Sequence, residues 1–404
     1  MTGELIEVAD IVRQYGEAFL ARYAWRTSWH QRRVLIDIAR CRTAAQGGHT
    51  LVCTDCGLVQ NAYNSCRNRH CPKCLGSARR RWTQAREVEL LPVPYFHVVF
   101  TLPHLLAPLA ASHPRVVYGI LFKAAAQTLL EVAADPRHLG ARIGFLAVLH
   151  TWGQKLNHHP HLHCVVPGGG LSPHGARWIP ARERFFLPVR VLSRLFRSKC
   201  LAMLWRAFAA SQLPCTGQMA RHRTPLGFKR LLAHARRQEW VVYAKRPFGG
   251  PTQVVRYLAR YTHRVAIANQ RIVRLADGRV TFRYKDYADG HATKLLTLPA
   301  VEFIRRFLVH VLPPGFIRIR HYGILANHDR TGHIALCRQR IAEAGIQAPP
   351  PEDLPEEAAA DTPEPVDPDH CPACRGDMTL LRTYPRPFLQ PQIRAQPALI
   401  WNTS

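Results

Sequence analysis

The sequence is poor in acidic residues. Of its 404 residues, 27 are Asp or Glu and 55 are Lys or Arg, which gives a formal net charge of +28 at pH 7. Eight of the acids lie in residues 349–370, a Pro-rich stretch without Lys or Arg, so the rest of the chain carries 55 basic against 19 acidic residues. Such an excess of positive charge indicates a polyanionic partner, most commonly nucleic acid. An anionic membrane surface and a generally Arg-rich proteome are the alternative explanations.

The sequence also lacks segments that would direct it to a membrane. The N-terminal stretch MTGELIEVADIVRQYGEAF is acidic and amphipathic, without the basic region and apolar core of a secretory signal. No uncharged apolar run reaches membrane-spanning length, because Lys123 interrupts RVVYGILFKAAAQTLLEVAA. We therefore expect a cytoplasmic protein with no membrane partner, in which the 12 cysteines stay reduced.

Three Cys-x-x-Cys pairs stand out among these cysteines. The first two lie close together in CTDCGLVQNAYNSCRNRHCPKC, and two such turns supply four thiolates for a tetrahedral zinc ion. The predicted ligands of this structural zinc are Cys53, Cys56, Cys71 and Cys74. Cys41, Cys66 and His70 lie near enough in the sequence to replace a ligand or to bind a second ion. The alternative is a set of reduced core cysteines.

The third pair, Cys371 and Cys374, follows the acidic Pro-rich stretch. No second pair is nearby, although Cys337 or His370 could assist. Whether this pair binds a metal ion stays open at the level of sequence.

Hydrophobic periodicity predicts an α+β protein with a helical, zinc-containing front end and no internal repeat. Two helices are expected within residues 1–45, and a basic helix follows the zinc knuckles in ARRRWTQAREVELL. Runs of β-branched and aromatic residues predict strands at 95–102, 143–152 and 161–167, the last two paired. A hairpin is expected to turn at Asp277-Gly278.

The motif HPHLH at residues 159–163 predicts a second metal site. In a strand, His161 and His163 point to the same face and Leu162 is buried behind them. Gln154, across the presumed turn, is the candidate third ligand, and a mixed imidazole and amide-oxygen site suits Mg²⁺ or Mn²⁺. Three other histidines compete with it: His150, His158 and His159. The alternative is coincidence, because the chain has 22 histidines.

A helix starting near Thr252 is predicted in GGPTQVVRYLARYTHR. Tyr257 and Tyr261 are four residues apart, so both hydroxyl groups project from one face. A parallel row with the same spacing, suited to a phosphate backbone, consists of Arg256, Arg260 and Arg264. The alternative is that the tyrosines are core residues with solvated hydroxyl groups.

Taken in order along the chain, these blocks resemble the HUH endonuclease superfamily, and specifically the two-tyrosine transposases of the insertion-sequence-ninety-one family. The resemblance covers the N-terminal segment CRTAAQGGHT, the zinc region, FHVVFTLPH, HTWGQKLNHHPHLHCVVPGGG and YLARYTHRVAI. It fades after LANHDR at residues 326–330. The order and spacing of several blocks is far more specific than any one of them.

The resemblance implies roles for the residues named above. His161 and His163 match the histidine pair that binds a catalytic divalent metal ion, and Gln154 falls at the place of a polar third ligand. Tyr257 and Tyr261 match the two nucleophiles. It also implies an HUH-type antiparallel sheet flanked by helices, and nicking and rejoining of single-stranded or hairpin DNA at the ends of an insertion sequence. No GxxxxGK[ST] motif is present, so strand separation would fall to a host helicase or to folded DNA.

The expected domain organisation follows the order of the chain. Residues 1–92 form a helical zinc-binding and DNA-binding domain, and residues 93–330 form the nuclease domain. A helix and the acidic linker follow at 331–370, and a tail containing CPAC at 371–404. The competing functions are a plasmid rolling-circle replication initiator, a conjugative relaxase, which usually adds a third metal-binding histidine, and a zinc-dependent DNA-binding regulator without nuclease activity. The oligomeric state stays open.

Overall fold

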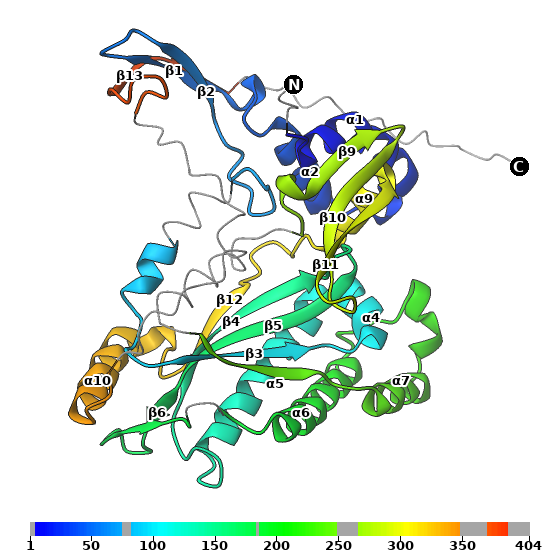
Figure 1. Ribbon diagram of the computed structural model, residues 1–404. Helices are drawn as coiled ribbons and strands as arrows, with labels where there is room; N and C mark the ends of the chain where they lie inside the picture. The colour runs from blue at the N-terminus through cyan, green and yellow to red at the C-terminus, as the bar shows by residue number, and fades with distance from the viewer. Residues whose placement is uncertain (1–4, 75–81, 183–185, 249–265, 348–369, 387–404) are drawn as a thin grey trace, which may run out of the picture.

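An antiparallel five-stranded sheet forms the centre of the structure, a computed structural model that describes residues 5–74, 82–182, 186–248, 266–347 and 370–386 (Figure 1). The strand order is β12-β4-β5-β3-β8. The strands are β3 (Tyr95–Thr101), β4 (Gly144–Trp152), β5 (His158–Pro167), β8 (Val242–Phe248) and β12 (Ile319–Gly323). The predicted pairing of β4 with β5 is confirmed, with Val148 opposite His163. The α+β class with an antiparallel sheet is therefore confirmed.

Helices cover one face of this sheet. They are α4 (Ala107–Ser112), α5 (Pro114–Ala134), α6 (Val189–Ala209) and α7 (Pro225–Arg237). Because side chains alternate across a strand, the sheet sends Phe100, Phe145 and Leu162 into this core, and all three are fully buried. Helix α5 is long and apolar enough to span a membrane by composition, but 67% of its most apolar window is buried inside the protein. It is the central helix of the core.

The opposite face of the sheet is covered at one end by α10 (Arg330–Glu343) and by the small hairpin β6 (Gly169–Leu171) and β7 (Trp178–Pro180). Ile334 and Cys337 of α10 share a core with Val148 and Val165 of the sheet. The histidines of β4 and β5 lie on this same face, further along the strands. Within ARRRWTQAREVELL, helical residues are described only over 82–87.

A second core joins the N-terminal helices to a segment from late in the chain. Helices α1 (Val8–Tyr23) and α2 (Trp29–Arg40) pack on α9 (Ala300–Val309) and on the sheet of β9 (Ile272–Ala276), β10 (Arg279–Asp286) and β11 (Ala292–Pro299). Its fully buried residues include Ile11, Val34, Phe282 and Phe303. The N-terminal helices therefore fold onto residues 266–308 and have no separate core of their own.

Local sequence signals explain where these elements begin and turn. The Ser28 side chain accepts a hydrogen bond from the backbone of Gln31, and the Gln31 side chain accepts one from the backbone of Ser28, so a capping box starts α2. The β9–β10 turn is at Asp277-Gly278 as predicted, with φ of 53° and 68°. Positive φ at both positions fits the turn that joins two strands directly.

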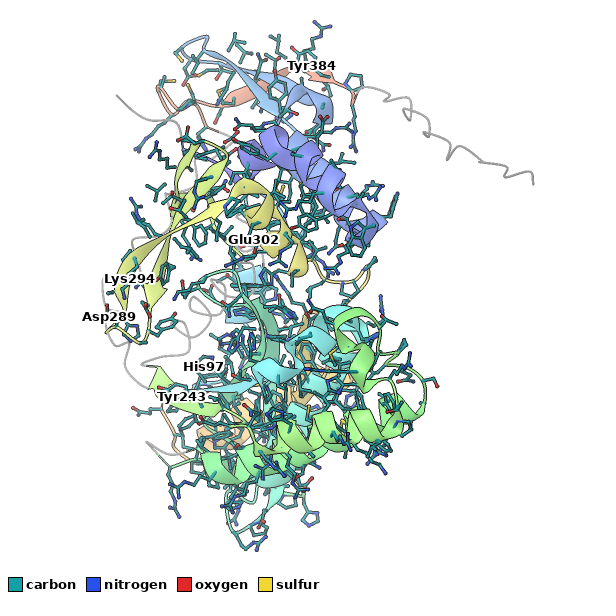
Figure 2. The ribbon with its side chains drawn as sticks, turned by 90° about the vertical axis from the view of Figure 1, so that its right-hand side faces the viewer. His97, Tyr243, Asp289, Lys294, Glu302 and Tyr384 are labelled. Carbon is teal, nitrogen blue, oxygen red and sulfur yellow. The ribbon has the colours of Figure 1, made fainter. Side chains whose placement is uncertain are left out.

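A third, smaller sheet pairs two strands from early in the chain with one strand from late in the chain. Its order is β13-β1-β2, formed by β1 (Gly48–Cys53), β2 (Val59–Tyr63) and β13 (Met378–Tyr384). Figure 1 shows the blue N-terminal strands beside the red C-terminal strand, and Figure 2 places Tyr384 at the same end of the molecule.

Short 3-10 helices connect the longer elements. They lie at Ala24–Arg26, Ala44–Gln46, His104–Leu106, Gly217–His222, Asn269–Arg271 and Asn327–Asp329.

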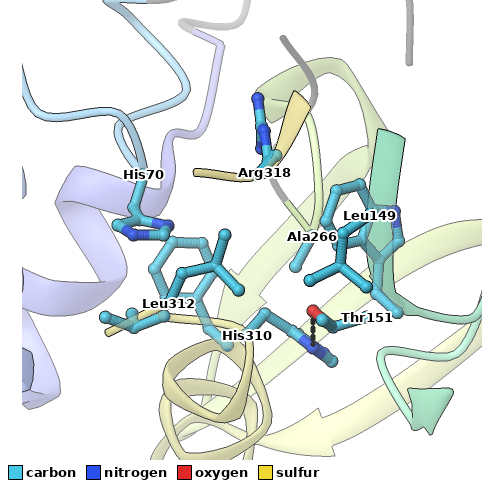
Figure 3. Close-up of a pocket in the computed structure, with 10 residues that line it drawn as sticks. His70, Leu149, Thr151, Ala266, His310, Leu312 and Arg318 are labelled. Atoms are coloured by element: carbon cyan, nitrogen blue, oxygen red, sulfur yellow. Dashed lines mark hydrogen bonds between the residues drawn. The ribbon is translucent and has the colours of Figure 1, made fainter. Parts of the chain in front are cut away.

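Buried histidines lie where the N-terminal core meets the large sheet. His310 Nε2 donates to the Leu156 carbonyl at 3.3 Å, so Nδ1 of the neutral ring accepts a hydrogen bond from Thr151 Oγ1 at 3.2 Å. His310 and His70 line one pocket with Arg318 (Figure 3). Burial lowers the pKa of His310 and of His70 to about 3, and that of His158 to about 4.

These depressed pKa values predict that acid destabilises the fold. The unfolded histidines take up protons near pH 6.5, whereas the folded ones do so only near pH 3 to 4, so stability is fully present above about pH 6.5 and is lost as the pH falls toward 4. Urea unfolding at several pH values in this range would measure the loss. His310→Gln should make the dependence shallower, whereas the exposed control His174→Gln should leave it unchanged. A urea midpoint that does not move between about pH 7 and about pH 5 contradicts this account.

Candidate active site and metal centres

Three histidines converge on the face of the large sheet opposite helices α5 and α6. The ring nitrogens of His150, His161 and His163 that could hold a metal ion lie within 4.8 Å of one another. His150 of β4 is directly opposite His161 of β5 in the antiparallel register. His161 and His163 share a face, and Leu162 between them is fully buried on the helix side. The predicted side-by-side arrangement of these two imidazoles is present in the structure.

A hydrogen bond and burial keep the His161 ring in the neutral form that a metal ligand needs. His161 Nδ1 donates to the His159 carbonyl at 2.7 Å, which leaves the lone pair on Nε2. Burial lowers the pKa of His161 to about 4, so this ring is neutral at pH 7 and can bind a cation. The sequence points to His161 as a ligand, and only the structure shows which of its nitrogens is held.

His97 of β3 contacts the histidine cluster, and sequence reasoning missed it. Its Nε2 and His163 Nδ1 share a hydrogen bond of 2.7 Å, and the two rings are parallel within 1° with centroids 4.9 Å apart. His97 is itself buried, at 2% exposed, and Figure 2 shows it inside the sheet region. The signal was available in FHVVF, because alternation along β3 puts His97 on the same face as the histidines of the adjacent strand β5.

The side chain of Gln154, the predicted third ligand, is hydrogen-bonded to residues outside the histidine cluster. Gln154 Nε2 donates to Tyr287 Oη at 3.0 Å, and its Oε1 accepts from the backbone of Lys285 at 3.5 Å. Gln154 lies in the turn after β4, whereas His150 lies within the strand at the level of His161. An all-imidazole set suits a transition metal ion better than Mg²⁺.

The two other competing histidines also lie outside this group. His158 Nε2 is hydrogen-bonded to Tyr118 Oη of α5 at 2.8 Å, on the helix side of the sheet. His159 supplies its carbonyl to His161 and lies with its ring centroid 5.2 Å from that of His161.

The N-terminal cysteines divide into two clusters, and the structure does not bring the predicted set of Cys53, Cys56, Cys71 and Cys74 together. The first cluster consists of Cys41, Cys66, Cys71 and Cys74. The physical reason is the β1–β2 hairpin between the pairs. Cys41 and Cys66 lie at its base, whereas Cys53 and Cys56 lie at its tip, roughly 17 Å away at about 3.3 Å per residue.

The first cluster has the chemistry of a structural zinc site. Cys74 Sγ lies 3.4 Å from Cys41 Sγ and 3.5 Å from Cys66 Sγ. Hydrogen bonds from the neighbouring thiols, Cys41 first, lower the pKa of Cys74, whereas hydrogen bonding with Cys41 raises the pKa of Cys71. Competition of this kind between thiols is removed when one cation holds four thiolates, the usual shell of structural zinc. Cys41 and Cys71 also belong to the core of α1 and α2.

Cys53 and Cys56 instead lie beside Cys371 and Cys374, the C-terminal pair. Cys337, a possible additional ligand in the sequence analysis, is instead buried in the core between α10 and the large sheet. His370, the other possible ligand, does not belong to the cluster of four sulfur atoms. No disulfide is formed among the 12 cysteines, all of which the structure describes.

The predicted nucleophiles and their arginine row lie outside the described residues. These are Tyr257, Tyr261, Arg256, Arg260 and Arg264, all within 249–265. The described chain stops at Phe248, the end of β8, and resumes at Ala266. Ala266 lines a pocket with Trp152 (Figure 3). The Trp152 ring stacks on that of His150, with centroids 4.7 Å apart. The first described residue after the tyrosine segment thus lies near a ring that stacks on a member of the histidine cluster.

Exposed aromatic residues beside arginines form a surface suited to nucleic acid at the α1–α2 corner. Trp25 is 76% and Trp29 72% exposed. The Arg26 guanidinium lies 4.2 Å from the centroid of Trp25, and that of Arg33 lies 5.7 Å from Trp29. Planar rings can stack on bases, and arginines can bind phosphates.

Comparisons with known proteins define the class as DNA transposases with a zinc-binding domain. A family model described as "Putative transposase" matches residues 144–332, and one described as "Transposase zinc-binding domain" matches residues 11–102. The chain is 55% identical over 345 residues to "Putative transposase y4qJ" of Sinorhizobium fredii (strain NBRC 101917 / NGR234), covering 85% of this chain and 86% of that protein. No solved structure gives a significant match.

A second relative identifies the family. The chain is 30% identical over 298 residues to the "Transposase for insertion sequence element IS801" of Pseudomonas savastanoi pv. phaseolicola, covering 71% of this chain and 68% of that protein. The chain belongs to the insertion-sequence-ninety-one (IS91) family of transposases.

The regrouped cysteines predict the effect of single substitutions on zinc content. Cys41→Ser and Cys66→Ser should each remove about one zinc ion per chain, and Cys41→Ser should also destabilise the α1–α2 core, to which Cys41 belongs. Atomic emission on purified protein measures the metal. Cys200→Ser, in the core under α6, is the matched control and should retain all of it. If Cys41→Ser keeps its full zinc content, Cys41 is not a zinc ligand, and the set predicted from the sequence is favoured again.

Proposed function

We propose that this IS91-family transposase nicks and rejoins single-stranded DNA through 5′-phosphotyrosine intermediates, in a rolling-circle type of transposition. The observation that carries the proposal is the cluster of His150, His161 and His163 on the face of the sheet opposite the helices. Ala266, the first described residue after the tyrosine segment, lines a pocket with Trp152, and the Trp152 ring stacks on that of His150. The enzyme would be a metal-dependent, site-specific endonuclease and strand transferase.

The reaction follows from the residues and their chemistry. Tyr257 Oη forms a bond to the scissile phosphorus, the bond from phosphorus to O3′ breaks, and the tyrosine proton leaves while the departing O3′ gains one. A divalent metal ion held by the three imidazoles would supply Lewis-acid stabilisation of the charge on the non-bridging phosphate oxygens. Burial would keep His161 neutral for this task, and the His159 carbonyl orients its ring. His97 orients the ring of His163 by a hydrogen bond.

A second nucleophile explains how one chain can process two DNA strands. The phosphotyrosine ester conserves the energy of the cleaved bond, so rejoining to a new 3′-OH needs no nucleotide hydrolysis. Tyr261 would make a second cleavage while the first end stays attached to Tyr257. Strand separation would be supplied by folded DNA or by a host helicase.

DNA binding is proposed to involve both the arginine row and the α1–α2 corner. Arg256, Arg260 and Arg264 would bind phosphates next to the nucleophiles, and Trp25 and Trp29 would stack on unpaired bases. The net charge of +28 predicts that this binding weakens steeply as salt rises.

A conjugative relaxase is the second candidate, because the third imidazole, His150, matches the ligand number usual for that class. Membership of the transposase family favours the first proposal over this one and over a plasmid replication initiator. A zinc-dependent regulator without nuclease activity would leave the three convergent imidazoles unexplained.

Covalent adduct formation tests the proposed nucleophiles. Wild-type protein with Mn²⁺ and single-stranded oligonucleotides from the ends of its element should form an adduct visible on a denaturing gel. Tyr257→Phe and Tyr261→Phe should each retain cleavage at one site, and the double variant should form no adduct while still binding DNA. DNA binding without an adduct in the wild-type protein, with every metal and both ends tried, would refute the nuclease and favour the regulator.

The ligand set predicts a different ranking of variants in the same assay. His150→Ala and His161→Ala should abolish the adduct, and His97→Ala, which acts through His163, should lower its rate about 10- to 100-fold. Gln154→Ala should stay near the wild-type rate, because its side chain bonds to Tyr287 and Lys285. Extra Mn²⁺ should partly rescue His97→Ala. A Gln154→Ala variant as inactive as His150→Ala would restore the amide oxygen as a ligand.

A further inference from the structure

Two cysteine pairs from opposite ends of the chain meet at the tip of the β1–β2 hairpin. Cys53 Sγ lies 3.4 Å from Cys374 Sγ, and Cys56 Sγ lies 3.7 Å from Cys371 Sγ. All four sulfur atoms lie within 4.8 Å of one another. The family model for the zinc-binding domain ends at residue 102, so it includes only one of these pairs.

The backbone around each pair is folded in the same way. The Gly57 N–H donates to the Cys53 carbonyl at 3.1 Å, and the Arg375 N–H donates to the Cys371 carbonyl at 2.9 Å. Gly57 and Arg375 each have positive φ, 71° and 64°. The Gly376 N–H is directed at Cys374 Sγ at 3.4 Å, a contact that suits a thiolate. Two equivalent turns therefore present four sulfur atoms toward one point.

The small sheet that carries these turns has no apolar core to hold it. Among the described residues, none of β1, β2 or β13 belongs to any of the hydrophobic core clusters. Val59, Leu380 and Leu381 are 57%, 63% and 62% exposed. Three short strands that bury so little apolar surface are not stable by themselves, and small units of this kind are usually held by a metal ion or a disulfide.

We propose that Cys53, Cys56, Cys371 and Cys374 bind a second structural zinc ion, which fastens the C-terminal segment to the N-terminal hairpin. A shell of four thiolates selects a soft tetrahedral ion, and zinc is the commonest of these. Sulfur separations of 3.4 and 3.7 Å are those of ligands around a shared ion, since a disulfide bond is about 2.05 Å.

The zinc ion holds the N-terminal end of β13 beside Cys53. The pairing of β13 with β1 begins there. The register runs antiparallel from Cys53 opposite Met378 to Gly48 opposite Tyr384, and Tyr384 Oη lies 2.7 Å from Thr50 Oγ1. Because of this pairing, the C-terminal end of β13 lies at the base of the hairpin, near the first cysteine cluster. One ion at each end of the hairpin thus fixes residues 41–74 and 370–386 as one unit.

Zinc content tests the site independently of the proposed strand transfer. Wild-type protein should contain about two zinc ions per chain, one for each cysteine cluster. The double variant Cys371→Ser/Cys374→Ser should lose one of them. The matched control Cys200→Ser/Cys215→Ser, buried in the main core, should keep both. Unchanged zinc in the C-terminal variant overturns the proposal, whether or not the nuclease activity is present.

A cleavage experiment tests the fastening without relying on a cysteine variant. A specific protease site is inserted between Ala359 and Ala360 of the full chain, and the cut protein is passed over a sizing column. The C-terminal fragment should stay with the rest of the protein, leave it on treatment with a zinc chelator, and rejoin it when zinc is restored. It should also stay bound in Cys71→Ser/Cys74→Ser, in which only the first cluster is changed. Loss of the fragment without chelator, or its release by a thiol reductant alone, overturns the proposal.

Discussion

The antiparallel pairing of β5 between β3 and β4 is the constraint on which the candidate active site depends. In this pairing every second side chain of three adjacent strands faces the same way. His150 of β4, His161 and His163 of β5, and His97 of β3 therefore meet on one face. The other face is committed to the core under α5 and α6, so a slip of one residue would turn Leu162 and its neighbours out of that core. The hydrophobic core thus fixes the register that brings the histidines together.

Burial gives these histidines their chemical character. The pKa of His161 falls to about 4 because the charged form loses its hydration inside the protein, so the ring stays a neutral donor at physiological pH. The His159 carbonyl then selects which nitrogen of His161 carries the proton. His97 constrains His163 in a similar way from the adjacent strand. Side chains that strands and hydrogen bonds hold in this way would need little rearrangement to bind a metal ion.

The N-terminal part of the molecule is held by a different balance of forces. Helices α1 and α2 bury apolar residues against α9 and β10, and the first cysteine cluster lies at the edge of this core. The β13-β1-β2 sheet is largely exposed and depends on its cysteines and on its strand hydrogen bonds. Segments from early and late in the chain are combined in both cases, so neither unit corresponds to a continuous stretch of sequence.

The sequence by itself determined what is local. Runs of β-branched and aromatic residues located β3, β4 and β5, and the Asp277-Gly278 pair located the β9–β10 hairpin. The spacing of His161 and His163 put both rings on one face of the sheet. These properties depend only on neighbours along the chain. Only the tertiary structure decided which distant residues complete each site. His150, and not Gln154, lies beside His161, because the strand register puts the two histidines opposite each other. Cys41 and Cys66, and not Cys53 and Cys56, lie beside Cys71 and Cys74, because the hairpin separates its base from its tip. The partner of the C-terminal pair lies more than three hundred residues away, and only the pairing of β13 with β1 brings it into contact.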